Sequence, residues 1–499
     1  MCCVFVCELC CLVPVGAGVL LGLALSRWLF YPAQPPLLPS EERALALSKS
    51  EVLAIREKHF CAAQTISFKN TRPLMILQGK GQYLFDEEGH RYLDTRNNVG
   101  HVGWQHPDFI GAVQRQLNSY NGNTRYLHPM RAMLAQRLLS KFDSSLSVVF
   151  FVNSGSEAND LALRLAQTYT GHSDCVVVDR AYHGHTSSTL SLSPYKYEHV
   201  GGHSYAKDNV HKVRCPDMYR GPYADELPSE AARLYSQDMS AAVKDAVKRN
   251  GGVAAFFIES GMSVAGVILP PPGYLKTCFD LVRAAGGLCV CDEVQTGFAR
   301  FGKHFWGFEQ QAVVPDIVTM GKAMGNGFPL AAVVTTPEIA RAFQNGLEYF
   351  NTFGGNPVAC AAGLAVLDII DLENLQRNAL EVGTHLLQLL QSLSASEAGY
   401  LIGDIRGIGL FIGVEFVTDR KTKTPATRET SWLCSWLKDE HRILTSIDGA
   451  FDNVLVIKPP LSFTHANAEE LVNAMQAALI ALKVKPLDLA GGRHGHTPT

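Results

Sequence analysis

The sequence of 499 residues predicts an α/β protein with a mostly parallel central sheet covered by helices, followed by a smaller α+β domain. Apolar runs rich in β-branched residues alternate with helical patterns through the middle of the chain. These runs are continuous rather than alternating, which indicates strands that are buried on both faces. After about residue 380 the pattern changes to a helix, the segment GDIRGIGLFIGVEF, a second helix and a last apolar run, which indicates a separate smaller domain.

The clearest strands of the large sheet are short runs of apolar and β-branched residues. They cover residues 147–152, 175–179, 253–260, 287–294, 316–320 and 331–336. We therefore predict a large domain over residues 111–375 and a smaller C-terminal domain over residues 376–485. Residues 51–110 are expected to pack beside the smaller domain.

The two ends of the chain differ in composition from these domains. Residues 36–50 are expected to form a linker, and residues 486–499 have the composition of a disordered tail. Residues 9–25 are apolar and reach about the minimum length of a membrane span, but Glu8 precedes the first positive charge, which is unlike a transit peptide. Two explanations stay open for residues 1–35: a membrane anchor, which would make a membrane a partner, or an error in the assigned start of the gene.

Composition narrows the class of protein. Hydrophobic residues make up 47% and charged residues 18%, which is typical of a globular enzyme and excludes a disordered chain. The formal net charge of −3 gives no reason to expect nucleic acid as a partner. Cysteines scattered through apolar runs indicate free thiols in a reducing compartment, hence an intracellular protein, mitochondrial or cytosolic. No Cys/His spacing predicts a metal site.

Ligands of an open α/β sheet bind outside the carboxyl ends of its strands, and the first such end here is the segment NSGSEAND at residues 153–160. A strand runs into a Gly-Ser turn and then a helix. The amides of Gly155 and Ser156 at that helix N-terminus form a cradle for a phosphate. The alternative is an ordinary capped helix, with Ser154 or Ser156 as the cap.

The second strand end is CDEVQTGF at residues 291–298. Asp292 ends a strand so hydrophobic that its carboxylate needs a partner, and a protonated pyridine nitrogen is one. Val294 is then placed to pack on the ring, and Gln295 to bond the ring hydroxyl. The alternatives are a helix cap, a structural ion pair, or a metal held by Asp292 and Glu293, which no histidine cluster supports.

The third strand end, at residues 319–329, holds Lys322 among Gly321, Gly325 and Gly327. Desolvation at such a place lowers the pKa of a lysine and makes its amine nucleophilic, whereas the alternative is a lysine in a surface loop. A phosphate cradle, an aspartate and a lysine in this order suit pyridoxal phosphate bound as a Schiff base to Lys322. Lys322 and Asp292 are the predicted catalytic residues.

The order and spacing of these strand ends resemble the class III aminotransferases, the fold-type I branch of pyridoxal-phosphate enzymes, over about residues 52–480. Further similar blocks cover residues 97–107, 181–185, 216–223, 351–357 and 403–410. The resemblance implies a homodimer with shared active sites. It implies that Tyr182 stacks on the ring, that His183 and Glu259 also bind the cofactor, and that Thr352 reaches the cofactor phosphate of the neighbouring subunit.

Within this family, residues 123–128, 193–197, 423–427 and 453–463 are similar to the ethanolamine-phosphate and phosphohydroxylysine phospho-lyases. Thr296 and the NGFP segment are more similar to the aminotransferases of alanine–glyoxylate type. We therefore expect a phospho-lyase that converts ethanolamine phosphate, a small primary amine, to aldehyde, ammonia and phosphate. The alternatives are an aminotransferase that uses glyoxylate or pyruvate as acceptor, and a 5-phosphohydroxy-lysine phospho-lyase.

A non-catalytic relative kept for binding is a further alternative, but Lys322, Asp292 and Gln295 are all present. Three basic residues bear on the substrate. In the aminotransferases the arginine that matches Arg406 binds a substrate α-carboxylate, and the alternative for Arg406 is a residue that caps a turn. Arg125 and Lys196 are candidates for the leaving phosphate, with solvated surface charge as the alternative.

Overall fold

The computed structural model describes residues 36–69 and 71–487. The chain divides into two compact units, Met1–Thr65 and Ile66–Thr499. The described part of the first unit holds α2 (Pro39–Leu45), which lies inside the expected linker, and α3 (Lys49–His59). The candidate anchor at residues 1–35 lies outside the described residues, as does nearly all of the expected tail.

A membrane-spanning helix was searched for in the described residues alone, and none of their helices is long and apolar enough to cross a bilayer.

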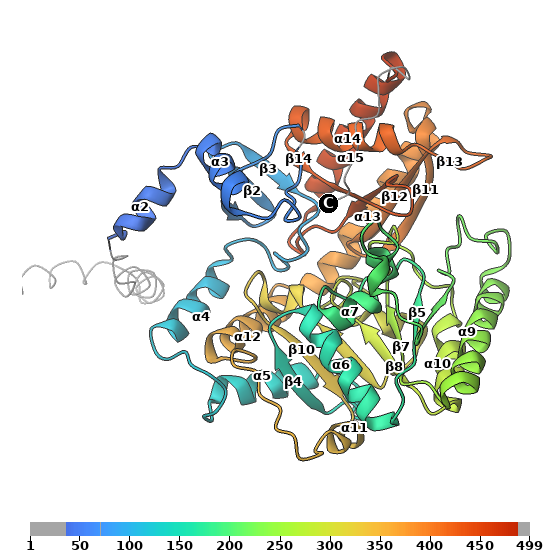
Figure 1. Ribbon diagram of the computed structural model, residues 1–499. Coiled ribbons are helices and arrows are strands. Elements are labelled where there is room, and N and C mark those ends of the chain that lie inside the picture. The colour runs from blue at the N-terminus through green and yellow to red at the C-terminus, as the bar shows by residue number, and fades with distance from the viewer. Residues whose placement is uncertain (1–35, 70, 488–499) are drawn as a thin grey trace, which may run out of the picture. The chain divides into compact units, whose positions relative to one another are not determined.

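The large sheet of the second unit has seven strands in the order β4-β10-β9-β8-β7-β5-β6 (Figure 1). All neighbours from β9 to β6 are parallel, and only β10 is antiparallel to its neighbours. The bounds are β4 (Val148–Val152), β5 (Cys175–Val178), β6 (Val210–Val213), β7 (Ala255–Glu259), β8 (Leu288–Asp292), β9 (Ile317–Met320) and β10 (Ala331–Thr335). The mostly parallel sheet and all six predicted strands are therefore confirmed, while the polar edge strand β6 was not predicted.

Both faces of this sheet are buried, as its continuous apolar strands predict. Phe257 of β7 packs in a cluster with α6 (Gly155–Thr170) and α11 (Pro337–Ala342). Its neighbour Phe256 points to the other face, because successive side chains of a strand alternate. That face is covered by helices with the bounds α9 (Pro228–Asn250), α10 (Tyr274–Ala284) and α12 (Pro357–Leu372).

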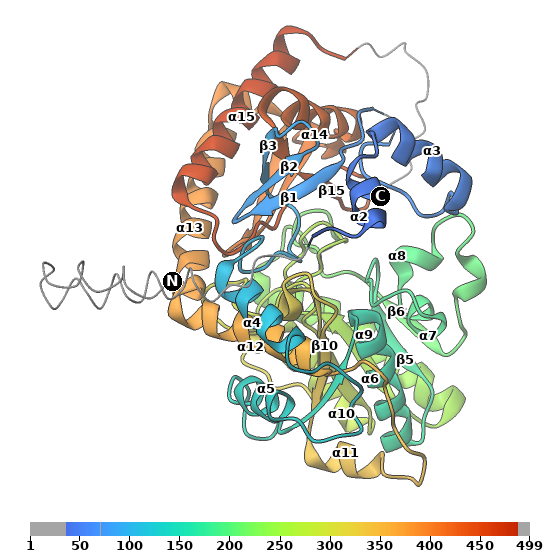
Figure 2. The same cartoon turned by 90° about the vertical axis from the view of Figure 1, so that its left-hand side faces the viewer.

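A second, antiparallel sheet lies in the C-terminal part of the chain, in the order β11-β12-β16-β15, with β13 paired to β12. Its strands are β11 (Ile402–Ile408), β12 (Phe411–Asp419), β13 (Thr424–Pro425), β15 (Ser446–Asp448) and β16 (Val454–Ile457). The helices of this part are α13 (Leu375–Ala395), α14 (Thr427–His441) and α15 (His465–Val484). Two of them, α13 and α15, lie side by side in both ribbon views (Figures 1 and 2).

A third sheet joins segments that are far apart in sequence. The strands β1 (Ile76–Lys80), β2 (Tyr83–Asp86) and β3 (Arg91–Asp94) form an antiparallel meander, and β14 (Ile443–Leu444) pairs parallel to β3. The remaining elements are α4 (Pro107–Leu117), α5 (Pro129–Leu139), α7 (Ser187–Ser191), α8 (Pro194–Tyr197), η1 (His203–Tyr205), η2 (Gly307–Gln311), η3 (Lys322–Gly325) and η4 (Glu397–Leu401). The exact domain boundaries stay a prediction.

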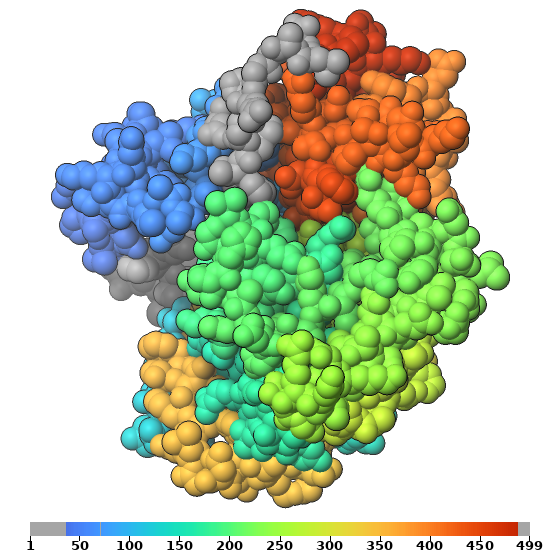
Figure 3. Space-filling model, turned by 45° about the vertical axis from the view of Figure 1, so that its right-hand side comes forward, coloured from blue at the N-terminus to red at the C-terminus, as the bar shows by residue number. Residues whose placement is uncertain are grey.

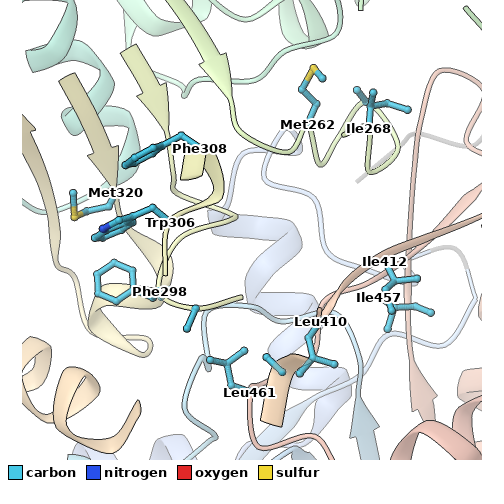
Figure 4. Close-up of a cluster of buried hydrophobic side chains, with 14 of the residues drawn as sticks. Met262, Ile268, Phe298, Trp306, Phe308, Met320, Leu410, Ile412, Ile457 and Leu461 are labelled. Carbon is cyan, nitrogen blue, oxygen red and sulfur yellow. The ribbon is translucent and has the colours of Figure 1, made fainter. Parts of the chain in front are cut away.

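One apolar cluster runs from the large sheet to the C-terminal sheet (Figure 4). Met320 of β9 and Trp306 belong to it on one side, and Ile412 of β12 and Ile457 of β16 on the other. The two sheets therefore share one core. None of the eight described cysteines forms a disulfide, which agrees with the free thiols predicted from the sequence. Only Cys61 among them is exposed.

The close packing of α13 on the turn between β11 and β12 gives a stability test. A Cβ atom added to Gly383 would collide with the backbone carbonyl of Gly409. A Gly→Ala change inside a helix normally stabilises by roughly 0.5–1 kcal/mol. Here we expect G383A to destabilise the protein by roughly 1–3 kcal/mol, because the clash is with backbone. Thermal denaturation should show a lowered Tm, while T384A, at an exposed neighbouring position, should change it little. A raised Tm for G383A would contradict this packing.

Candidate active site

The three predicted strand ends converge on one cavity of about 370 Å³. The strands β8 and β9 are neighbours in the sheet, so Asp292 and Lys322 come from the same edge. Every residue predicted to bind the cofactor lines this cavity except Thr352. The lining set is Gly155, Ser156, Tyr182, His183, Glu259, Asp292, Val294, Gln295 and Lys322.

The N-terminus of α6 forms one end of the cavity. Ser154 is the helix cap, and its hydroxyl accepts a hydrogen bond from the amide of Glu157 at 3.2 Å. The amides of Gly155 and Ser156 donate to no acceptor in the described part of the chain. A Cβ atom at Gly155 would lie 2.8 Å from Val294, so only glycine leaves this approach open. Capping thus accounts for Ser154, while two free amides face a site suited to an anion.

The carboxylate of Asp292 ends β8 and is only 4% exposed. Its Oδ2 accepts a hydrogen bond from Asn159 Nδ2 at 2.7 Å and lies 2.9 Å from Nδ1 of His183. Its Oδ1 accepts a hydrogen bond from the amide of Val294 at 3.0 Å. These contacts hold the carboxylate in one orientation and compensate for its burial.

Asn159 is a site residue that sequence reasoning missed. Its Oδ1 accepts a hydrogen bond from the hydroxyl of Thr319 at 2.7 Å, and its Nδ2 also donates to the His183 carbonyl at 2.8 Å. Asn159 therefore joins α6, β9 and the loop after β5 around Asp292. The available signal was its spacing, because a residue three positions after Ser156 lies on the same face of a helix.

Lys322 lies at the start of η3, directly after β9, and lines the cavity rather than the surface. Burial lowers the pKa of its ammonium, and the carboxylates of Asp292, Glu259 and Asp448 partly offset this shift. Within the described residues the ammonium makes no ion pair. Its backbone φ of +21° is uncommon for a residue other than glycine. A partly desolvated, unpaired amine is the state in which a lysine is nucleophilic.

Glu259 ends β7 directly opposite Asp292 in the parallel register. It is 3% exposed and therefore buried at the cavity wall. Its Oε1 accepts a hydrogen bond from the amide of Tyr182 at 3.1 Å, and its Oε2 accepts one from the amide of Ser263 at 3.3 Å. Burial raises the pKa of Glu259 to about 7, and the Asp292 charge adds to this effect.

The carboxylate next to Asp292 in sequence, Glu293, has a structural role. It accepts hydrogen bonds from the hydroxyls of Ser260 and Thr296 at 2.5 and 2.7 Å. The amides of Gly307 and Phe308, at the start of η2, also donate to it at 2.8 and 2.9 Å. No cluster of three or more His, Cys, Asp or Glu side chains suited to a metal occurs among the described residues.

The structure does not bring Arg406 to the cavity. Its Nη1 lies 2.7 Å from carboxylate oxygens of both Asp404 and Glu415, and its Nε and Nη2 donate to the Gly266 carbonyl at 2.9 and 2.6 Å. Arg220 also pairs with Glu415. This network joins the C-terminal sheet to the loop that contains Arg220. In the space-filling view the green middle part of the chain and its orange C-terminal part lie against each other (Figure 3).

Three more predicted residues lie outside the cavity lining: Lys196, Arg125 and Thr352. Lys196 is close to it, with its ammonium 5.9 Å from the ring centroid of Tyr182 and no ion pair within residues 36–69 and 71–487. Arg125 is half exposed and pairs with Glu348 at 2.9 Å. Thr352 is exposed, and so is open to a neighbouring subunit.

These residues fit pyridoxal phosphate. The free amides of Gly155 and Ser156 match its phosphate, and the buried carboxylate of Asp292 matches a protonated ring nitrogen. The buried Nε2 of His183 has no hydrogen-bond partner in the described residues, which leaves a polar atom for a bound group. Lys322 carries the amine that would attach the cofactor.

Comparison with known proteins agrees with this site. The family model Aminotransferase class-III matches residues 66–479. A Drosophila melanogaster relative named alanine–glyoxylate aminotransferase 2-like is 46% identical over 91% of this chain and 91% of its own length. The Caenorhabditis elegans ethanolamine-phosphate phospho-lyase homolog 1 is 42% identical over 87% of this chain and 94% of its own.

A solved structure, the phospholyase from Arthrobacter in complex with phosphoethanolamine, superposes with a TM-score of 0.81 at 36% identity. The superposed region covers 86% of this chain and 100% of the phospholyase chain. Relatives from Arabidopsis thaliana and human, 44% and 38% identical, are named as mitochondrial proteins. The chain therefore belongs to the class III aminotransferases and is an enzyme that uses pyridoxal phosphate.

Proposed function

We propose that the enzyme is a phospho-lyase that converts ethanolamine phosphate to acetaldehyde, ammonia and inorganic phosphate. The observation that carries this proposal is the state of Arg406. Its guanidinium is occupied by Asp404, Glu415 and the Gly266 carbonyl, and no arginine lines the cavity among the described residues. A substrate with an α-carboxylate would need a free arginine, and ethanolamine phosphate has no carboxylate.

The contacts of Arg406 count against the aminotransferase alternative. An aminotransferase of α-amino acids acts on a substrate whose α-carboxylate lies next to the reacting amine, so Arg406 would have to leave two carboxylates, and breaking such a buried pair costs several kcal/mol. In phosphohydroxylysine the phosphate lies next to the terminal amine, far from the α-carboxylate, so the contacts of Arg406 do not bear on that substrate. The relatives add support, because one is named an ethanolamine-phosphate phospho-lyase homolog and one solved structure is a phospholyase in complex with phosphoethanolamine.

The residues of the chain divide the work as follows in this proposal. Gly155 and Ser156 would bind the cofactor phosphate, and Asp292 would keep the ring nitrogen protonated. Pyridoxal phosphate, when bound, supplies a cationic ring that withdraws electrons from the substrate carbon next to nitrogen. Lys322 takes the proton from that carbon, because a lowered pKa leaves more of its amine unprotonated at neutral pH. The electron pair left on that carbon then forms a C=C bond to the neighbouring carbon as the C–O bond breaks, and phosphate leaves with the C–O electron pair. Water hydrolyses the remaining unsaturated amine to acetaldehyde and ammonia.

We also infer a homodimer in a mitochondrial or cytosolic setting. Thr352 is exposed, and so is Phe353, the next residue in the sequence, at 65%. Tyr126 and Leu127 are 74% and 103% exposed and directly follow Arg125, which pairs with Glu348, four residues before Thr352. An apolar surface of this kind marks a protein interface, and two chains related by symmetry would each place Thr352 at the other's site.

The first test measures phosphate release. Purified enzyme with pyridoxal phosphate and ethanolamine phosphate should release inorganic phosphate, acetaldehyde and ammonia in equal amounts. K322A should abolish turnover and the visible absorbance band of the lysine-bound cofactor. A wild-type enzyme that shows the band, releases no phosphate and instead transfers the amino group to glyoxylate would establish the aminotransferase alternative.

The second test concerns the support of Asp292. N159A removes the donor to Asp292 Oδ2, and loss of a hydrogen bond to a buried charge costs about 1.5–3 kcal/mol, which corresponds to a roughly tenfold to hundredfold lower kcat/KM. The control N209A removes an exposed amide that bonds only the Ser173 carbonyl, and steady-state kinetics should show no change. Equal kinetics for N159A and the wild type would remove Asn159 from the site.

The third test concerns the shared active site. K322A and T352A chains are denatured together, refolded with cofactor and assayed. In a hybrid dimer one site has both Lys322 and Thr352, so activity should exceed the sum of the two separate variants. Sedimentation should give twice the chain mass of 54.5 kDa. A monomer, or a mixture with no gain in activity, would show that Thr352 does not serve a partner's site.

A further inference from the structure

A second buried lysine, Lys458, lies beside the active site and has no place in the cofactor chemistry. It follows β16, is 6% exposed, and is fixed by a hydrogen bond from its amide to the Thr95 carbonyl at 2.7 Å. Its ammonium donates to the hydroxyl of Ser263 at 2.5 Å. Within the described part of the chain the ammonium makes no other hydrogen bond and no ion pair.

Lys458 directly follows strand β16 of the C-terminal sheet and does not itself line the cavity, but it is connected to a lining residue through Ser263. Ser263, its hydrogen-bond partner, donates its own amide to Glu259 Oε2 at 3.3 Å, and Glu259 lines the cavity. The ammonium interacts electrostatically with Lys322, Glu259 and Asp448. Lys458 is therefore a second buried cation in the surroundings of Glu259 and Lys322.

A buried ammonium is costly unless an anion accompanies it. The chain offers a matched comparison in Lys438, which is 2% exposed, pairs with Asp439 at 2.8 Å and donates to the Arg72 carbonyl at 3.1 Å. Lys458 makes no such ion pair within the described residues, and the carboxylates of Asp448 and Glu259 act on it without a direct contact. Burial lowers the pKa of Lys458 to about 8, and Asp448 opposes this shift while Lys322 and Arg300 add to it. An ammonium has three donors, and only one is used here.

We infer that Lys458 binds the phosphate group of the phosphorylated amine substrate, with the hydroxyl of Ser263 as a second donor. This inference rests on the proposed function, which it deepens. In ethanolamine phosphate only two carbons and one oxygen separate nitrogen from phosphorus. A substrate whose nitrogen is held at Lys322 must therefore have its phosphate close by, where a compact point charge suits an anion.

The same contact favours the reaction as well as binding. When the C–O bond breaks, the electron pair goes to the phosphate oxygen, and the negative charge on the phosphate increases. A fixed cation at that point stabilises the charge as it develops. Lys196, 5.9 Å from the Tyr182 ring, is a further cation close to the same cavity.

The test compares two ligands on the full-length holoenzyme. Ethanolamine phosphate and ethanolamine are titrated separately, and binding is followed by the change in the cofactor's visible absorbance. Wild type should bind the phosphorylated amine more tightly. K458M should weaken binding of ethanolamine phosphate roughly tenfold to hundredfold, because one charge-assisted contact is lost, and should leave the affinity for ethanolamine unchanged. K458R, which keeps the charge, should retain most of the preference.

Several controls make the result decisive. K438M removes the other buried lysine and should leave the preference unchanged. K458M replaces a buried charge with an apolar chain of similar length and is expected to fold, and K458Q is the second variant if it does not. The role of Lys458 would be overturned if the variant that folds and binds the cofactor, K458M or else K458Q, kept the wild-type preference for ethanolamine phosphate over ethanolamine. A wild-type enzyme that releases no phosphate would instead overturn the proposed function, so the two failures are distinct.

Discussion

Asp292 places a carboxylate at the end of a strand whose other residues are fully buried, in a sheet covered on both faces. Such a group is unfavourable unless donors surround it. Asn159 and the amide of Val294 donate to it, and the His183 ring lies against it. The start of α6, the loop after β5 and the end of β9 must all meet here, so the placement of this one carboxylate determines how the rest of the site is arranged.

Buried groups of opposite charge surround Glu259, the neighbour of Asp292 in the sheet. Glu259 lies opposite Asp292 in register, and burial together with the Asp292 charge raises the pKa of Glu259. Lys322 comes from the large domain and Lys458 from the C-terminal sheet, and both interact with Glu259. The site therefore depends on both domains, and the shared apolar core between the two sheets is what keeps their charges in place (Figure 4).

The network around Arg406 shows an arginine whose donors are occupied by the protein itself. Asp404 and Glu415 neutralise the guanidinium, and the Gly266 carbonyl takes two of its remaining donors. An arginine held in this way stabilises the contact between two parts of the chain.

The sequence by itself determined the large sheet and the identity of the central site residues. Strands buried on both faces need continuous apolar runs, and ligand-binding groups follow their carboxyl ends, so Asp292 and Lys322 could be found from local pattern alone. The contacts of Asn159, Arg406 and Lys458 are set only by the tertiary structure. Each depends on which distant segment supplies a hydrogen-bond partner or a counter-charge, and a local pattern does not contain the identity of that segment, because it is set by how the two domains pack.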